Sequence, residues 1–221
     1  MSEPEGKTTV GAGAISAVFN RLLASPLDML DDLGETVMLG AKAFVWFFRP
    51  PSRPWQLIAA IEFIGTGSLF IVALVGMFTG MAFTVSTIIG FRQFSAEGMV
   101  GGVVALALAR ELAPVLAAVV VTARAGSTIA SELGNMRVSE QIDAITTMGV
   151  SPVQYLVVPR VLATTLVLPL LALLFGITGM CGAYLVAVVW QGIDPGVFVD
   201  KIQSFLHWED IRMLIIKALV F

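Results

Sequence analysis

Two adjacent ionisable residues interrupt a long apolar stretch of this sequence. Arg110 and Glu111, followed by Pro114, stand in the middle of that stretch. An ionisable side chain at the centre of a bilayer costs at least about 2.5 kcal/mol, so such residues persist where they pair or line a wet cavity. Pro114 lacks an N–H and leaves the carbonyl of Arg110 without its usual helical donor. The pattern predicts a polar, locally weakened point, which either has a functional role or only locks helix packing.

A lysine in a later apolar segment is the natural partner for this point. Adjacent helical residues point about 100° apart, so Arg110 and Glu111 cannot simply neutralise each other. They lie about ten residues, or roughly 15 Å, inside their segment, and Lys217 lies about 9 Å along the segment that begins at Ile211. At these similar depths we expect Glu111 to pair with Lys217. Arg110 is expected to face a backbone carbonyl or the transport path.

A second set of polar residues follows the same apolar segment. Residues 132–149 contain a short amphipathic pattern, for which Ser139 is the expected N-cap and Gly149 the expected stop. One face carries Val138, Ile142 and Ile145, and the other carries Glu140, Gln141 and Asp143. Such a helix could rest on the membrane or dock into a soluble partner, and the residue pattern does not choose between them.

Motifs for catalysis, metal binding and nucleic-acid binding are missing from the sequence. The single histidine, His207, cannot form a zinc site or a triad, and the single cysteine, Cys181, excludes an internal disulfide. There is no GxxxxGK[ST] phosphate loop for ATP hydrolysis. A net charge of −3 gives no basis for nucleic-acid binding. We therefore expect no enzymatic activity, no cofactor and no metal.

The elements that position these residues are predicted to be membrane-spanning helices. Hydrophobic residues make up 57% of the chain and charged residues 13%, about half the charge of a soluble domain. Three apolar segments, 57–91, 100–129 and 155–190, are each long enough to span a bilayer. The first is longer than necessary and is expected to be tilted, or broken at Gly65 and Gly67. A fourth span begins at Ile211 but has only about half of the ~20 residues required, so we expect a chain truncated at its C-terminal side.

The remaining sequence predicts the organisation around these spans. Residues 1–14 form a polar tail, residues 15–54 form amphipathic helices at the membrane interface, and residues 55–221 form the membrane domain. Basic residues concentrate before the first span and around the loop after the second, which places the N-terminus and residues 132–152 in the cytoplasm. Small-residue pairs with GxxxG-type spacing predict close helix contacts: Gly76/Gly80, Gly98/Gly102 and Gly179/Ala183.

Several of these segments resemble one known family. The runs 109–116 (ARELAPVL), 124–127 (RAGS), 132–145 (ELGNMRVSEQIDAI), 148–152 (MGVSP) and 158–160 (VPR) resemble the MlaE/YrbE permeases of MCE-associated ABC transporters. The resemblance implies an all-α, polytopic permease that forms a homodimer in the bacterial inner membrane. It also implies a cytoplasmic ABC ATPase, outer MCE-domain proteins and phospholipid as the transported molecule.

The resemblance also assigns roles to individual residues. Residues 132–149 correspond to the helix that couples the permease to the ATPase, with candidate coupling residues Glu132, Arg137, Glu140, Gln141 and Asp143. Phe83, Phe91 and Phe94 correspond to an outward-open acyl-chain pocket, and Arg110, Glu111 and Lys217 form its polar cluster.

Two other classes of function remain open at the level of sequence. An ion-driven secondary transporter would use Arg110 and Glu111 as a proton or ion relay and would need no ATPase. A non-transporting scaffold would only anchor an envelope complex. Copurification of an ATPase separates the first alternative from an ABC permease, and lipid in a cavity separates the second.

Overall fold

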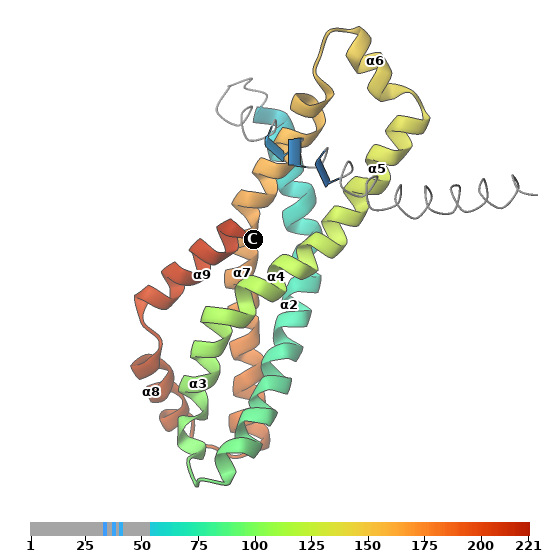
Figure 1. Cartoon of the computed structure of the whole chain (residues 1–221). Helices are drawn as coiled ribbons and strands as arrows, with labels where there is room; N and C mark the ends of the chain where they lie inside the picture. The colour runs from blue at the N-terminus through green and yellow to red at the C-terminus, as the bar shows by residue number, and fades with distance from the viewer. Residues whose placement is uncertain (1–32, 35–36, 39, 42–53) are drawn as a thin grey trace, which may run out of the picture. The chain divides into compact units, whose positions relative to one another are not determined.

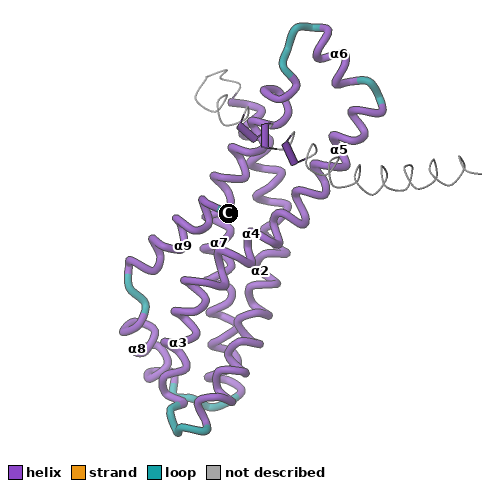
Figure 2. The backbone as a smooth tube through the Cα atoms, in the orientation of Figure 1, coloured by secondary structure: helices purple, strands orange, loops and turns teal. Residues whose placement is uncertain are grey.

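The computed structural model describes residues 33–34, 37–38, 40–41 and 54–221 of the chain. The chain divides into two units, Met1–Pro50 and Pro51–Phe221, and the described residues of the first unit are helical. The predicted polar tail and almost all of the predicted interfacial helices at 15–54 lie outside the described residues. All regular secondary structure from residue 54 onward is helical (Figure 2), as the apolar composition predicts.

The first membrane helix is continuous. Helix α2 runs from Pro54 to Arg92 over 39 residues, which excludes a break at Gly65 and Gly67 and leaves the tilt as the remaining prediction. Gly67 instead makes room for a neighbour, because a Cβ atom there would collide with the guanidinium group of Arg124. Gly67 therefore marks a close side-chain approach, and neither glycine interrupts the backbone.

The second span is one helical stretch with two irregular turns. It covers Glu97–Val138 and contains the short 3-10 turn Glu97–Met99, α3 (Val100–Ala107), α4 (Ala113–Val121) and α5 (Ser127–Val138). Two π-helical segments join these helices, the first π turn (Leu108–Leu112) and the second π turn (Thr122–Gly126). π turns inside α-helices often occur at functional sites.

The third span returns across the bundle and is followed by two shorter helices. It covers Val153–Trp190, with α7 (Val158–Tyr184) between the π-helical segments Val153–Val157 and Leu185–Trp190. Helices α8 (Pro195–Phe205) and α9 (Trp208–Val220) follow. Within the described residues, three helical stretches are long and apolar enough to cross a membrane, as predicted. The chain is thus an all-α, polytopic membrane protein.

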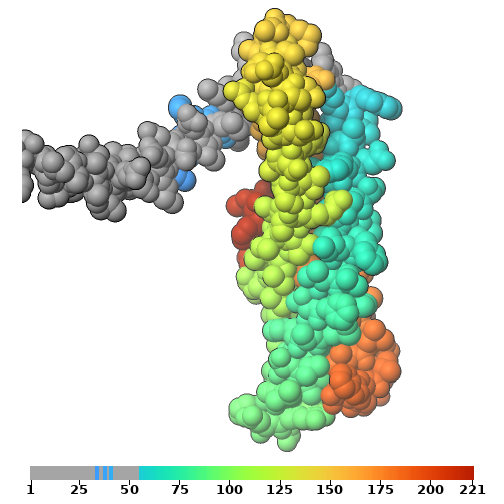
Figure 3. All heavy atoms as spheres, turned by 90° about the vertical axis from the view of Figure 1, so that its right-hand side faces the viewer, coloured from blue at the N-terminus to red at the C-terminus, as the bar shows by residue number. Residues whose placement is uncertain are grey.

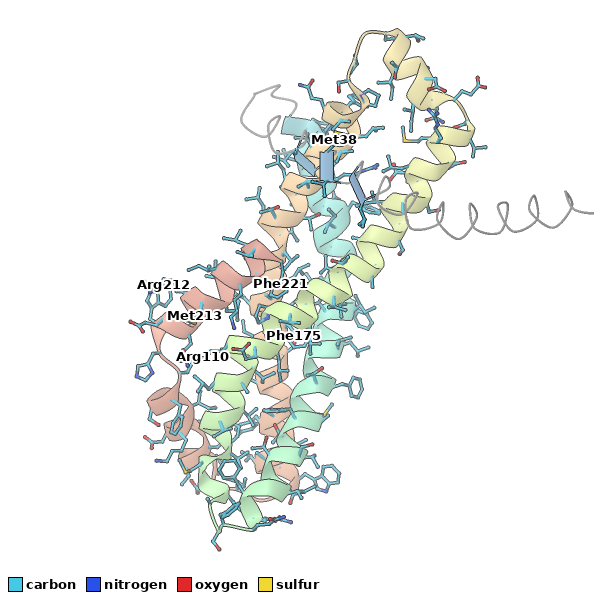
Figure 4. All side chains as sticks on the ribbon, viewed as in Figure 1. Met38, Arg110, Phe175, Arg212, Met213 and Phe221 are labelled. Carbon is cyan, nitrogen blue, oxygen red and sulfur yellow. The ribbon has the colours of Figure 1, made fainter. Side chains whose placement is uncertain are left out.

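Helices α2 and α7 form the central contact of the bundle, as Figure 1 shows. A Cβ atom at Gly80 would overlap the backbone of Gly179, and one at Gly76 would press on the backbone of Phe175. The predicted close approach at Gly76, Gly80 and Gly179 is therefore confirmed. Phe175, labelled in Figure 4, is completely buried in the core beside this contact.

Helix α8 packs on α3 at the end of the bundle away from α6 (Gln141–Thr147), as Figure 1 shows. Asp194 caps α8 by accepting a hydrogen bond of 3.0 Å from the N–H of Val197, and Pro195 occupies the first turn. Gly101 and Gly102 allow the contact, since a Cβ atom at either would collide with α8. The apolar pattern did not predict this helix, although Asp194-Pro195 is a typical helix start.

The predicted coupling segment is divided between two helices. Helix α5 continues to Val138, and α6 begins only at Gln141. Ser139 is not the N-cap of α6, because its hydroxyl donates backward to the carbonyl of Asn135 (2.7 Å). Gly149 ends α6 as predicted: it has a φ of +74°, and Val150 N–H bonds back to the carbonyl of Ile145.

Candidate functional site

The carbonyl group of Arg110 has an unusual donor. It lies in the first π turn, and Pro114 cannot supply the N–H that an α-helix would provide four residues later. The ammonium group of Lys217, on α9, donates to this carbonyl at 2.7 Å. A side chain more than 100 residues away thus replaces the missing backbone donor.

Lys217 also forms the ion pair that the sequence predicts. Its Nζ lies 2.8 Å from Oε1 of Glu111. The same ammonium group therefore bonds a carboxylate and a backbone carbonyl of the first π turn. Both contacts tie α9 to the middle of the second span.

Arg110 pairs with a carboxylate instead of the expected backbone carbonyl. Its Nε donates to Oδ1 of Asp210 at 2.6 Å, from the side of the second span that faces α9 (Figure 4). Asp210 is only 1% exposed, and its other oxygen accepts the N–H of His207 at 2.8 Å. This partner was not predicted, because an acid just before a short apolar segment resembles a loop residue; in the structure Asp210 occupies the first turn of α9. The available signal was its place three residues after a possible N-cap.

These four residues, Arg110, Glu111, Asp210 and Lys217, form what we call the charged cluster. Its two ion pairs carry no net charge and cross-link one π turn to one short helix. Among the described residues, no group of His, Cys, Asp and Glu side chains could hold a metal ion. The arrangement suits electrostatic latching of two helices better than bond-making chemistry.

A further arginine in the membrane-spanning region was not singled out from the sequence. Arg124 lies in the second π turn, and its Nη1 donates to the buried hydroxyl of Ser68 at 3.2 Å. Its guanidinium carbon lies 5.8 Å from the ring centre of Phe63, within cation–π range. Arg124 is a charge within an apolar segment, as Arg110 is, so the same pattern indicates a polar point at both positions.

The candidate coupling residues are split between α5 and α6. Glu132, on α5, pairs with Arg160 at 2.8 Å, and Arg137 pairs with Asp143 of α6 at 2.9 Å. Glu140 occupies the turn between the helices with a φ of +56°, and Gln141 bonds the hydroxyl of Ser139. The Arg137–Asp143 pair therefore fixes α6 to the end of α5, while their polar groups stay exposed.

The three candidate pocket phenylalanines lie toward the opposite end of α2. Phe83 and Phe91 are partly buried against the core, whereas Phe94, beyond the helix, is 80% exposed. The charged cluster does not include them. The bundle brings Arg110, Glu111 and Lys217 together and leaves the phenylalanines as a separate group.

Comparison with known proteins identifies the class to which this bundle belongs. The family model described as "Permease MlaE" matches residues 57–221, which include the charged cluster. The chain belongs to the MlaE permease family, as the motifs predicted. It is therefore a membrane-embedded permease subunit of a transporter.

Individual relatives support this assignment. A probable ABC transporter permease protein of Synechocystis is 40% identical over 208 residues, covering 94% of this chain and 75% of the relative. The intermembrane phospholipid transport system permease protein MlaE of Haemophilus influenzae is 37% identical over 207 residues, covering 88% of this chain and 79% of the relative. The chloroplastic protein TRIGALACTOSYLDIACYLGLYCEROL 1 of Arabidopsis thaliana is 40% identical over 161 residues, covering 73% of this chain and 46% of the relative.

Proposed function

We propose that this chain moves phospholipids between the inner membrane and the outer envelope of a bacterium, driven by a separate ATPase subunit. The observation that carries the proposal is the similarity to the phospholipid transport permease of Haemophilus influenzae, which extends over 88% of this chain. The lack of a phosphate loop in the sequence is consistent with ATP hydrolysis by another polypeptide.

In this proposal the charged cluster is a latch between the second span and α9. The two ion pairs hold α9 against a π turn, whose backbone already departs from regular helical bonding. Breaking them together would free α9 to move as a unit, and a transporter needs discrete states of this kind. The alternative is that the same contacts only stabilise one fixed packing of these helices.

The proposed energy coupling uses the end of the second span that leads into α6, beyond the charged cluster. Helix α6 projects from the bundle at the end where α2 begins (Figure 1). The proposed ATPase contact consists of exposed residues on α6, in the turn before it and on α5: Gln141 and Asp143, Glu140, and Arg137 and Glu132. This end is the cytoplasmic one in our proposal, because the basic residues of the sequence concentrate around it.

The proposed lipid path requires a second copy of the chain. In a homodimer, Phe83, Phe91 and Phe94 would line an acyl-chain pocket that opens toward the MCE-domain partners. Phenylalanine is apolar and well suited to contact acyl chains, and Phe94 is largely exposed in the single chain.

Copurification tests this function against its rivals. The chain is expressed with candidate ATPase and MCE-domain subunits from the same genome, and purified through a tag on the permease alone. We expect the ATPase to copurify and phospholipid to remain bound. A permease that transports lipid in an ion gradient without any ATPase would instead be a secondary transporter, and a complex without lipid would be a scaffold.

A further inference from the structure

A second polar region lies outside the charged cluster, in a pocket of about 560 Å³. The first turns of α2, helix α5 and the start of the third span enclose it, and its lining includes Gln56, Ala59, Phe63, Glu132, Tyr155 and Arg160. Pockets for small ligands usually have volumes of about 300–1,000 Å³. The space is thus large enough for a polar headgroup.

Arg160 lines this pocket and carries a donor that is not satisfied. Its Nη2 pairs with Glu132 at 2.8 Å. Its Nη1 is buried and has no hydrogen-bond partner among the residues that the structure describes. A buried donor without an acceptor is costly, more so when the group is charged. The guanidinium group therefore favours a ligand that brings an acceptor, and an anionic oxygen is the strongest one.

The surrounding charges favour an anion. Phe63 forms part of the pocket wall, and the guanidinium of Arg124 lies against its ring. One arginine thus lines the pocket and a second contacts a ring of its wall, whereas the lining includes one carboxylate. That carboxylate, on Glu132, is 52% exposed, whereas the Arg160 side chain is 19% exposed. The exposed Glu132 side chain can therefore turn into solvent more readily than the mostly buried Arg160 side chain.

The position of Arg160 along the third span fits the headgroup layer of a membrane. About 30 residues of continuous helix separate it from Trp190, which is roughly 45 Å at 1.5 Å per residue. A bilayer with both headgroup layers measures about 40–45 Å. Arg92 and Gln191 bond each other at the Trp190 end. When that end lies at one headgroup layer, Arg160 lies at the other.

We propose that this pocket binds the phosphate group of a glycerophospholipid from the leaflet on the α6 side of the membrane. When Glu132 turns away, the phosphate oxygens take its place and accept from the guanidinium group of Arg160, and the glycerol and acyl chains follow the apolar wall at Ala59 and Phe63. The site would hold the transported lipid on the side opposite the phenylalanine group. It rests on the proposed phospholipid transport, but its binding step requires neither ATP nor a partner.

The test is a binding titration on the purified full chain in dodecyl maltoside, with phosphatidylglycerol counted as bound adducts by native mass spectrometry. Arg160→Ala removes one charge-assisted contact and is expected to weaken binding about tenfold or more. Glu132→Gln removes the competing carboxylate and is expected to strengthen binding. If the ion pair between Arg160 and Glu132 had only a structural role, both substitutions would weaken lipid binding, and that result would overturn the proposal.

Arg92→Ala is the matched control. Arg92 is also paired with a glutamate, Glu97 at 3.1 Å, but lies at the other end of α2. The Arg92→Ala substitution should leave phosphatidylglycerol binding unchanged. An equal loss of binding in Arg92→Ala and Arg160→Ala would mean that the lipid is attracted to basic residues in general.

Arg160→Lys keeps the charge and separates loss of the site from misfolding. This variant should retain part of the lipid binding, and a loss as large as that of Arg160→Ala contradicts the proposal.

Inorganic phosphate distinguishes a lipid site from an ion site. If added phosphate displaces phosphatidylglycerol at equal concentration, the pocket is a free-anion site and the lipid assignment is wrong. Unaltered lipid counts in Arg160→Ala would show that the guanidinium group does not bind the lipid, and would overturn the proposal. Since the assay measures no transport, these failures are distinct from failure of the proposed function.

Discussion

At the scale of single residues, Lys217 has two tasks. It neutralises Glu111 and supplies the donor that Pro114 removes from the carbonyl of Arg110. A lysine can do both because its ammonium group has three donors. Substitutions at this position therefore disturb a backbone group as well as an ion pair.

A charge exchange tests the Glu111–Lys217 pair. Glu111→Lys places two ammonium groups together and is expected to abolish transport. Adding Lys217→Glu restores the attraction, and transport should partly return. Recovery should be incomplete, because a glutamate at 217 cannot donate to the carbonyl of Arg110. The measurement is phospholipid transfer by inserted protein, and no recovery at equal insertion would show that the pair has no direct role.

The Arg110–Asp210 pair predicts a graded loss of stability. Asp210→Ala leaves Arg110 without its carboxylate and the N–H of His207 without its acceptor. Breaking a buried pair typically costs about 3–5 kcal/mol, and the lower end applies because Arg110 is 47% exposed. Asp210→Asn can still accept from His207 and should lose less. Thermal unfolding in detergent measures both, and equal melting temperatures for wild type and Asp210→Ala would refute the pair's contribution.

The sequence predicted some of these residues for clear physical reasons. Charges in apolar segments are few, so depth alone was sufficient to match Glu111 with Lys217. Asp210 was missed because an acid at the edge of an apolar segment resembles a loop residue in the sequence. Only the structure shows that it belongs to the first turn of α9. Arg160 gave no signal as a ligand group, since its unsatisfied nitrogen depends on the geometry of α5 and α7.

At the scale of elements, glycines that lack a Cβ atom allow the backbones of α2 and α7 to come close to each other. Gly80→Ala is expected to destabilise the bundle, because its Cβ would overlap the backbone of Gly179, which cannot move aside easily. Gly90→Ala is the control on the same helix, since no atom lies within 4 Å of that Cβ. It should be neutral or stabilise by about 0.5–1 kcal/mol. Equal melting temperatures for the two variants would contradict the proposed packing.

Helix α6 carries the prediction for energy coupling. Reversing Glu140 and Asp143 to lysine together should detach the ATPase, or uncouple its activity from lipid, while the permease still inserts. The double reversal Glu97→Lys and Asp200→Lys, at the far end of the bundle, is the control. Retained ATPase copurification and retained lipid-stimulated hydrolysis in the α6 variant would show that another surface binds the ATPase.

The spans were predictable and the irregular turns between them were not. Apolar length identifies the three spans directly, because the bilayer sets a minimum. The two π turns and the division at Glu140 depend on local hydrogen bonding that apolar periodicity does not report. Helix α8 was missed because its pattern is short, although Asp194-Pro195 marked its start.

At the scale of the whole molecule, the bundle separates three tasks along its length. Figure 3 shows one flank, where α2 and the second span lie side by side. The α6 end carries the proposed ATPase contact and headgroup pocket, the charged cluster lies farther along the second span, and the phenylalanine group lies toward the opposite end. Signals between the ends would pass through the second span, whose two π turns hold Arg110 and Arg124.

Phospholipid transport driven by ATP can be measured with the reconstituted permease. The chain and its ATPase partner are placed in liposomes, and transfer of a fluorescent phospholipid to MCE-domain protein or acceptor vesicles is measured with and without ATP. We expect directional transfer that requires ATP and is lost when the phosphate-loop lysine of the ATPase is replaced by alanine. Transfer that is unchanged without ATP, or absent although the complex hydrolyses ATP and holds lipid, would contradict the proposed function.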